Sequence, residues 1–361
     1  MIFPGFWKTS RVLCVLTAFV CLGMSVDMAS AQSNTASQAA PKKTTSKKTI
    51  TRKSTTSKVS TSLSTSSARR SRARSRAAAL ARAVREVQEP RFRLDESGAL
   101  VPDVRAEAAI IYDSATGHVL WESNSQNQRS IASITKVMTA VVFMEDSPSL
   151  SDEIVVQPTD VRAASTTYLR SGYRVTKGDL LHLTLVASDN AAARALARVS
   201  SLGSEAFIAR MNSKAAELGL TNTSYADPSG LLSANVSSAY DMAKLITYVS
   251  GDERIASVMR TPTYTVTAGR RVINIHSTNQ LVMNGDVDVQ AGKTGFITKS
   301  GYCLATLLRL PQGGPEVAVV VLGAKSNAGR FWETRHLFNW FASKAEDLLG
   351  TPLQAATATA N

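Results

Sequence analysis

A serine and a lysine three residues apart, Ser133 and Lys136, have the spacing of a nucleophile and its base. They lie in the segment SIASITKVMTAVVFME, where eight of the eleven residues from 134 to 144 are apolar. That density predicts a buried helix, and a buried ammonium must be paired or lose its proton. Because residues i and i+3 share a helix face, the amine could accept the hydroxyl proton. The simpler alternative is a capping serine and a surface lysine.

A serine nucleophile also needs an oxyanion site and groups that hold the substrate. Two further motifs supply candidates. The sequence ASDNAAA places Ser188 and Asn190 between two helical runs, and GKTG places Lys293, Thr294 and Gly295 at the end of a strand. Gly295 would let a substrate backbone approach, while the lysine and threonine offer a cation and a hydroxyl.

The order and spacing of the three motifs carry more weight than any motif alone. S-x-x-K at residue 133 and K-T-G at residue 293 each occur once, whereas S-x-N occurs four times. Only the copy at residue 188 has a suitable spacing, 55 residues after the first motif and 105 before the last. Penicillin-binding proteins and class A β-lactamases use this triple. The four histidines offer no obvious triad partner or close metal-ligand pair, so we expect no metal and no cofactor.

The first 31 residues have the pattern of an export signal. Two basic residues precede an apolar run over 12–26, and the small residues ASA end the segment. The run of 15 residues is shorter than the roughly 18–20 needed to span a bilayer, although an uncleaved anchor is the alternative. Removal of the signal would leave one cysteine, Cys303, which we expect in a buried strand. The protein is therefore expected in the periplasm or cell envelope.

Residues 32–100 are expected to form a basic, low-complexity tail and linker without a packed core. The whole chain has a net charge of +13. Residues 32–85 account for this charge, because they contain 14 Lys and Arg and no acidic residue. From residue 86 onward the net charge is −2. Export argues against a nucleic-acid-binding arm. Contact with anionic envelope polymers is one hypothesis, and a plain solvated spacer is the other.

Strand-like runs at both ends of a 101–349 domain enclose a mostly helical middle. A hairpin is expected over 106–123 and a meander of three antiparallel strands over 287–324, followed by a helix over 331–349. This order predicts an α/β (α+β) fold, with an antiparallel sheet flanked by helices and a helical subdomain. Residues 350–361 are expected to be a disordered C-terminus.

The chain resembles the low-molecular-mass penicillin-binding proteins, the D-alanyl-D-alanine carboxypeptidases and endopeptidases of bacterial cell walls. The likeness spans roughly residues 106–341 and includes IASITKVMTA, LVASDNAAA, MNSKAAELGLTNTSYADPSGL, STNQLV and GKTGFITKSGYCLA. The resemblance implies the fold of the serine β-lactamases and DD-peptidases. It also implies an acyl-enzyme mechanism on peptidoglycan stem peptides, with β-lactam antibiotics as covalent inhibitors.

Carried onto this sequence, the resemblance makes Ser133 the nucleophile, which attacks the carbonyl of the penultimate D-alanine. Lys136, neutral in a desolvated site, would be the base, although a direct role for this lysine is disputed in relatives. Ser188 would relay protons and Asn190 would hold the peptide amide. The backbone N–H groups of Ser133 and Phe296 would form the oxyanion hole.

The same resemblance makes Lys293 and Thr294 the residues that bind the carboxylate side of the substrate, with Gly295 beside them as a further substrate-binding residue. Arg330 matches an arginine that contacts the terminal carboxylate in some members, which favours a carboxypeptidase. The short segment after residue 341 and the sequences STNQLV and GKTGF favour the endopeptidases instead. The choice between these two branches stays open at the level of sequence.

Two other functions compete with a peptidase. A class A β-lactamase would carry E-x-x-L-N to activate the deacylating water, and the sequence contains no such run. A non-catalytic penicillin sensor would need a membrane-spanning signalling segment, and the sequence suggests none. We therefore expect a serine-type D-Ala-D-Ala carboxypeptidase or endopeptidase.

Overall fold

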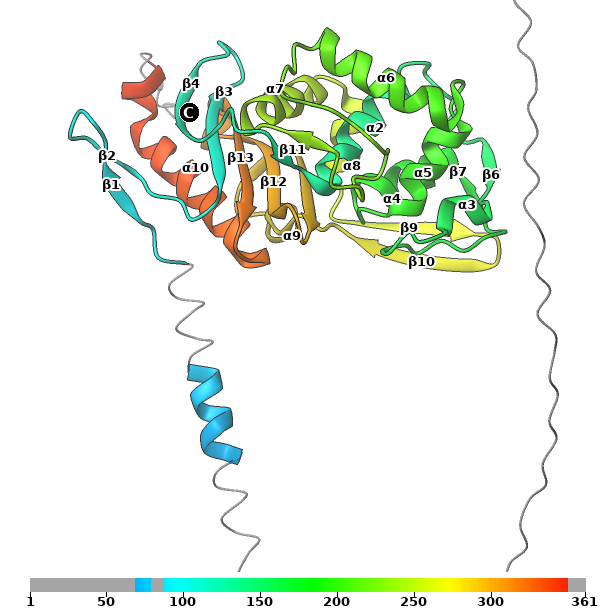
Figure 1. The fold of residues 1–361 in the computed structure, drawn as a ribbon, viewed down its shortest axis with the longest axis horizontal. Helices are drawn as coiled ribbons and strands as arrows, with labels where there is room; N and C mark the ends of the chain where they lie inside the picture. Colours follow the sequence, from blue (N-terminus) through cyan, green and yellow to red (C-terminus); the bar gives the residue numbers. More distant parts are fainter. Residues whose placement is uncertain (1–68, 79–87, 350–361) are drawn as a thin grey trace, which may run out of the picture. The chain divides into compact units, whose positions relative to one another are not determined.

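The computed structural model describes residues 69–78 and 88–349 (Figure 1). Residues 69–78 form a helix with exposed side chains. The expected export signal and C-terminal tail, and most of the basic tail, lie outside the described residues. No helix in the described ranges is long and apolar enough to cross a membrane.

A five-stranded antiparallel sheet forms the centre of the fold, in the order β11-β12-β13-β3-β4. Its strands are β3 (Ala108–Asp113), β4 (Val119–Ser123), β11 (Asp288–Ile297), β12 (Gly301–Arg309) and β13 (Glu316–Ala324). Strands from both ends of the domain therefore pair side by side. The expected hairpin, meander and α/β architecture are confirmed.

Helices cover both faces of the sheet. The run EVAVVVLGA of β13 is buried at all but its first residue, as expected for a strand covered on both sides. On one side α10 (Asn327–Leu349) lies along the sheet (Figure 1). Its side chains Phe331, Phe338 and Phe341 are buried in the core on this side. On the other side lie α7 (Ala239–Ser250) and α8 (Glu253–Met259).

The helical subdomain surrounds a central buried helix, α2 (Thr135–Met144), every residue of which is buried. Four helices pack against it, namely α4 (Lys177–Leu185), α5 (Asn190–Val199), α6 (Gly203–Glu217) and α7. The short helix α3 (Pro158–Val161) also belongs to the subdomain and packs against α5. Two short strands, β6 (Glu153–Val155) and β7 (Arg174–Thr176), pair beside them. The prediction of a buried helix at this position is confirmed.

Several short elements were not predicted. The strands β5 (Arg129–Ser130) and β8 (Val236–Ser237) form a small pair. A longer hairpin joins β9 (Thr263–Ala268) to β10 (Arg271–His276), and α9 (Gln280–Asn284) follows it. The 3-10 helices are η1 (Ala132–Ile134) and η2 (Pro311–Gly313).

The folded domain begins before the expected boundary at residue 101. The strand β1 (Phe92–Leu94) pairs with β2 (Leu100–Pro102). The Phe92 ring packs edge-on against His336 of α10, with 4.9 Å between centroids. A ring nitrogen of His336 also lies 2.8 Å from the carbonyl oxygen of Arg91. The hairpin was missed because its two strands have three residues each and contact α10 only through tertiary packing.

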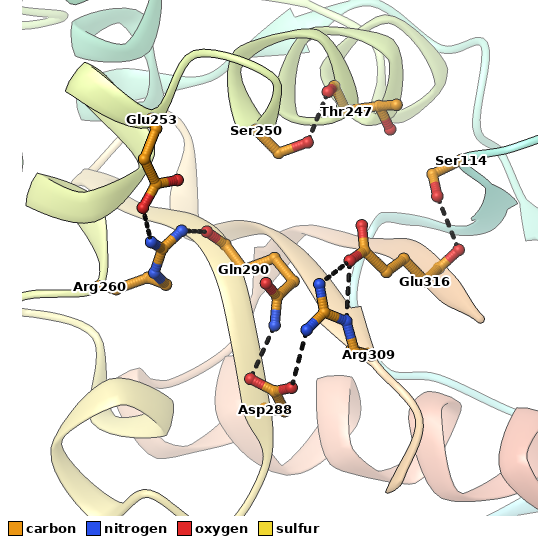
Figure 2. A network of polar contacts seen from close by, with 9 residues as sticks. All are labelled: Ser114, Thr247, Ser250, Glu253, Arg260, Asp288, Gln290, Arg309 and Glu316. Atoms are coloured by element: carbon orange, nitrogen blue, oxygen red, sulfur yellow. Dashed lines mark hydrogen bonds and ion pairs between the residues drawn. The ribbon is translucent and has the colours of Figure 1, made fainter. Parts of the chain in front are cut away.

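Polar contacts join the ends of three strands to α8 at one edge of the fold (Figure 2). Arg260 donates to the backbone oxygen of Gln290 over 3.0 Å, and the Gln290 amide donates to Asp288 over 2.7 Å. Arg309 lies between Asp288 and Glu316, at 3.8 and 2.5 Å. Because these side chains are all at least partly exposed, each contact contributes at most about 1 kcal/mol.

Candidate active site

The nucleophile candidate lies on a short 3-10 turn that leads into the buried helix. Ser133 is in the middle of η1, and α2 begins two residues later. The side chain is partly exposed and lines a cavity of about 520 Å³. The residue at the N-cap of α2 is Ile134, which makes no side-chain cap bond. A capping role for Ser133 is therefore wrong.

Lys136 is completely buried and directs its amine at the serine. Its Nζ lies 2.9 Å from Ser133 Oγ, 2.7 Å from Asn190 Oδ1 and 2.5 Å from the carbonyl oxygen of Ser229. A neutral amine has two N–H donors and one lone pair. The amide and carbonyl oxygens can only accept, so they take the two donors. The lone pair then faces the hydroxyl of Ser133.

Burial lowers the pKa of Lys136 to about 7, against the opposing charges of Asp189 and Asp227. Asp189 is itself fully buried and caps α5 by accepting from the Ala192 N–H over 2.9 Å. A surface lysine is therefore excluded. A substantial fraction of the amine is unprotonated near neutral pH, as a general base requires.

A loop held by Asp227 places the carbonyl oxygen that contacts Lys136. The Asp227 carboxylate accepts from the backbone N–H groups of Ser229, Gly230 and Leu232 at 2.6, 2.9 and 2.7 Å. Gly230 has a φ of +79°, and a Cβ there would collide with the carbonyl oxygen of Ala132. Sequence reasoning did not assign a role to this loop, although the turn signature DPSG marks it.

A second serine–lysine pair lies across the cavity. Ser188 has a φ of +59° and comes just before α5. Lys293 Nζ donates to Ser188 Oγ over 2.9 Å and to the backbone oxygen of Thr294 over 3.0 Å. Burial holds the pKa of Lys293 well below its usual value, and the nearby charges of Lys136 and Arg330 act in the same direction.

The β11 strand forms the wall next to the nucleophile. A Cβ at Gly295 would lie 2.6 Å from the carbonyl oxygen of Ile131 and 3.2 Å from the backbone nitrogen of Ser133, so only glycine allows the strand to approach this turn. Phe296 follows, with its ring half-exposed and stacked on Tyr302 at 4.2 Å between centroids. Both proposed oxyanion residues, Ser133 and Phe296, line the cavity.

Arg330 reaches the same cavity from α10 but is engaged by the sheet. Its guanidinium donates to the carbonyl oxygens of Gly295 and Cys303, over 3.0 and 3.2 Å, and to Asn327 Oδ1. Burial lowers its pKa to about 10. Its predicted contact with a substrate carboxylate stays a prediction. Cys303 is fully buried in β12, as expected.

Thr278 is a cavity residue that sequence reasoning missed. It lies in the turn between β10 and α9, and its hydroxyl oxygen is 2.6 Å from that of Thr294. Its backbone N–H donates to the carbonyl oxygen of Val186, which ties the turn to the Ser188 segment. Thr278 is the middle residue of the S-x-N copy that begins at Ser277. That copy was rejected because of its spacing, so Thr278 was not considered.

The structure brings all the predicted site residues together. Seven of them line the cavity: Ser133, Ser188, Asn190, Thr294, Gly295, Phe296 and Arg330. The lysines lie behind the wall and bond to the two serines. Among the described residues, the cavity lining includes no carboxylate and no histidine. The arrangement favours acyl transfer to a serine that an amine activates.

Comparisons with known proteins agree with this chemistry. The S11 peptidase family, described as D-alanyl-D-alanine carboxypeptidase, matches residues 95–326. A D-alanyl-D-alanine endopeptidase of Haemophilus influenzae is 34% identical over 66% of this chain and 83% of the relative. The D-alanyl-D-alanine carboxypeptidase DacC of Escherichia coli is 33% identical over 66% of this chain, but over only 62% of the relative.

Solved structures show the same fold. The Streptomyces K15 DD-transpeptidase superimposes with a TM-score of 0.62 at 27% identity, over 66% of this chain and 97% of that one. A D-alanyl-D-alanine carboxypeptidase from Mycobacterium tuberculosis H37Rv gives a TM-score of 0.62 at 26% identity, over 67% and 93% of the two chains. The fold class expected from the sequence is thereby confirmed.

Proposed function

We propose that Ser133 is the nucleophile of this chain. The chain belongs to the D-alanyl-D-alanine carboxypeptidase family and is a serine-type D-Ala-D-Ala peptidase of peptidoglycan. The observation that carries the proposal is the amine of Lys136, buried and 2.9 Å from the Ser133 hydroxyl. Asn190 Oδ1 and the Ser229 carbonyl oxygen accept the two N–H groups of the neutral amine, so its lone pair faces the Ser133 hydroxyl.

In the acylation step, Ser133 Oγ attacks the carbonyl carbon of the penultimate D-alanine and its proton passes to Lys136. The carbonyl oxygen becomes an oxyanion, which the N–H groups of Ser133 and Phe296 would stabilise. The C–N bond then breaks. The proton held by Lys136 would then pass to the departing amine by way of the Ser188 hydroxyl, which leaves Lys136 neutral again. Ser188 Oγ accepts from Lys293, so its own O–H is free to donate.

In the deacylation step, water enters where the amine departed and loses its proton to the same set of groups. The acyl–enzyme ester breaks, Ser133 regains its proton, and the shortened stem peptide leaves. Asn190, held by Lys136 and by the Ala164 carbonyl oxygen at 2.7 Å, would keep the peptide amide aligned through both steps. Thr294 would hold the carboxylate side of the substrate.

We further propose that the preferred reaction is endopeptidase cleavage of cross-links. In a cross-link the leaving amine belongs to a second stem peptide, so it is much larger than D-alanine. The cavity residues around Ser188 are small, namely Ser165, Thr166, Ala187 and Thr278. The 34% identity to a D-alanyl-D-alanine endopeptidase supports the same branch.

Purified muropeptides test both statements. We expect the enzyme to cleave a D-Ala cross-linked dimer faster than it trims a monomeric pentapeptide, with both activities lost in Ser133→Ala. Faster trimming of the pentapeptide would place the enzyme among the carboxypeptidases. Cleavage by Ser133→Ala at the parental rate would overturn the assignment of the nucleophile.

We also propose that the protein is exported to the cell envelope and that its basic segment contacts anionic polymers there. In the helix at 69–78, five arginines are exposed: Arg69, Arg70, Arg72, Arg74 and Arg76. Such a charge density favours polyanions at low salt. Replacing all five with glutamine should weaken salt-sensitive adsorption to isolated sacculi without changing cleavage of a soluble peptide. Equal adsorption at low salt would reduce the segment to a spacer.

A further inference from the structure

Two hydroxyls meet at the part of the cavity where Thr294 is proposed to bind the substrate carboxylate. Thr278 Oγ1 and Thr294 Oγ1 are 2.6 Å apart, and both residues line the cavity. Thr294 is 3% exposed and lies in β11, whereas Thr278 is partly exposed and lies in the turn before α9. The two residues are 16 positions apart in sequence, so the contact depends on tertiary packing.

The position of Thr278 is fixed from its backbone. Its N–H donates to the carbonyl oxygen of Val186 over 3.0 Å, two residues before Ser188. The following residue, Asn279, is 3% exposed and caps α9 by accepting from the Leu281 N–H over 3.1 Å. A threonine on such a rigid turn presents its hydroxyl in one direction, because its χ1 is restricted.

A hydroxyl has one proton to donate and two lone pairs. When Thr278 donates to Thr294, the proton of Thr294 is free to point at an anionic oxygen in the cavity. Without this partner the Thr294 hydroxyl could rotate and donate elsewhere. Lys293 does not replace the partner, since its amine contacts the backbone oxygen of Thr294 and not the hydroxyl.

We infer that Thr278 is a positioning residue that orients the Thr294 hydroxyl toward the carboxylate of the substrate. The inference rests on the proposed function, in which Thr294 binds that carboxylate. Thr278 thereby sets selectivity for a carboxylate over a neutral group at this end of the cavity. Hydrogen bonds to charged groups contribute more than those between neutral groups.

Two substrates that differ in one group test this role. The peptides are identical except that one ends in D-Ala-D-Ala with a free carboxylate and the other with a carboxamide. Thr278→Val keeps the shape of the side chain and removes the hydroxyl. We expect kcat/KM for the carboxylate peptide to fall about tenfold, mostly through KM, with little change for the carboxamide. Thr278→Ser should restore most of the loss.

Two further variants separate orientation from structure. Ser277→Ala removes a hydroxyl from the same turn, one that accepts from the Asn279 N–H at 3.2 Å, and should leave the carboxylate preference unchanged. If Thr278 acts through Thr294, the double variant Thr278→Val, Thr294→Val should lose no more than Thr294→Val alone. Losses that multiply would show a separate role for Thr278 and overturn the inference, as would equal losses on both peptides.

The outcome for the parent enzyme separates this inference from the proposed function. If the parent cleaves neither peptide and is not acylated by benzylpenicillin, the proposed function fails. If the parent is active and prefers the carboxylate, but Thr278→Val keeps that preference, only the role of Thr278 fails.

Discussion

The amine of Lys136 lies 2.9 Å from the hydroxyl oxygen of Ser133. Lys136 belongs to α2, a helix in which every residue is buried. The same amine contacts Asn190 and the Ser229 carbonyl oxygen. These contacts come from three separate parts of the chain. The lysine is therefore held in one position, and its burial favours the neutral base.

Acylation by a fluorescent penicillin should depend on pH through Lys136. Burial lowers its pKa to about 7, so the neutral, base-competent form increases as pH rises through that value. We expect the second-order acylation rate to rise between pH 6 and 8, in proportion to the neutral fraction, and to fall about tenfold per pH unit well below 7. A rate that is flat across this range would point to another base.

Replacing Lys136 with arginine should nearly abolish acylation, because arginine cannot act as a base. We expect a loss of at least about a hundredfold, typical of removing a general base. Lys136→Met is a matched variant that fills the site without an amine, and it should be equally slow. Thermal unfolding of both variants checks that the fold survives. A Lys136→Arg variant that is acylated at nearly the rate of the parent would contradict the role of Lys136.

Gly230→Ala should destabilise the protein and slow acylation. The φ of +79° and the collision with the Ala132 carbonyl oxygen should together lower the unfolding free energy by about 3 kcal/mol. Gly269→Ala is the matched control, since its φ is +62° but its Cβ would meet no atom within 4 Å. That control should cost about 1–2 kcal/mol and leave acylation unchanged. Equal effects of both changes would show that the collision is relieved.

Arg330→Gln should reveal whether this arginine supports the strand or contacts the substrate. Its guanidinium bonds to the carbonyl oxygens of Gly295 and Cys303, so its loss should cost about 2 kcal/mol of stability. If it acts only through β11, the variant should slow cleavage of the carboxylate and carboxamide peptides equally. A loss confined to the carboxylate peptide would establish the direct contact predicted from sequence.

Local patterns predicted the parts of the site that lie on regular elements. The buried helix, the S-x-x-K pair and the K-T-G strand were visible because apolar periodicity and motif spacing are properties of neighbouring residues. The central sheet followed from its apolar runs. For the same reason the expected burial of Cys303 in β12 was correct.

The missed groups act through contacts between distant residues. The Ser229 carbonyl oxygen reaches an amine 93 positions away, and Thr278 reaches Thr294 across 16 positions. Such contacts depend on how the β9–β10 hairpin and the Asp227 loop pack, and no periodicity in the sequence encodes that. The short β1–β2 hairpin was missed for a similar reason, because it is attached to α10 by tertiary contacts.

The central claim is that Ser133 forms the acyl-enzyme, and intact-mass spectrometry with benzylpenicillin tests it most directly. The cavity lining has no carboxylate among the described residues to activate a deacylating water, and the opened ring stays tethered where the leaving amine would depart. We expect one adduct, mapped by peptide digestion to Ser133, that persists for hours and is absent from Ser133→Ala. An adduct on another residue, or catalytic penicillin hydrolysis with loss of the adduct within seconds, would contradict the claim.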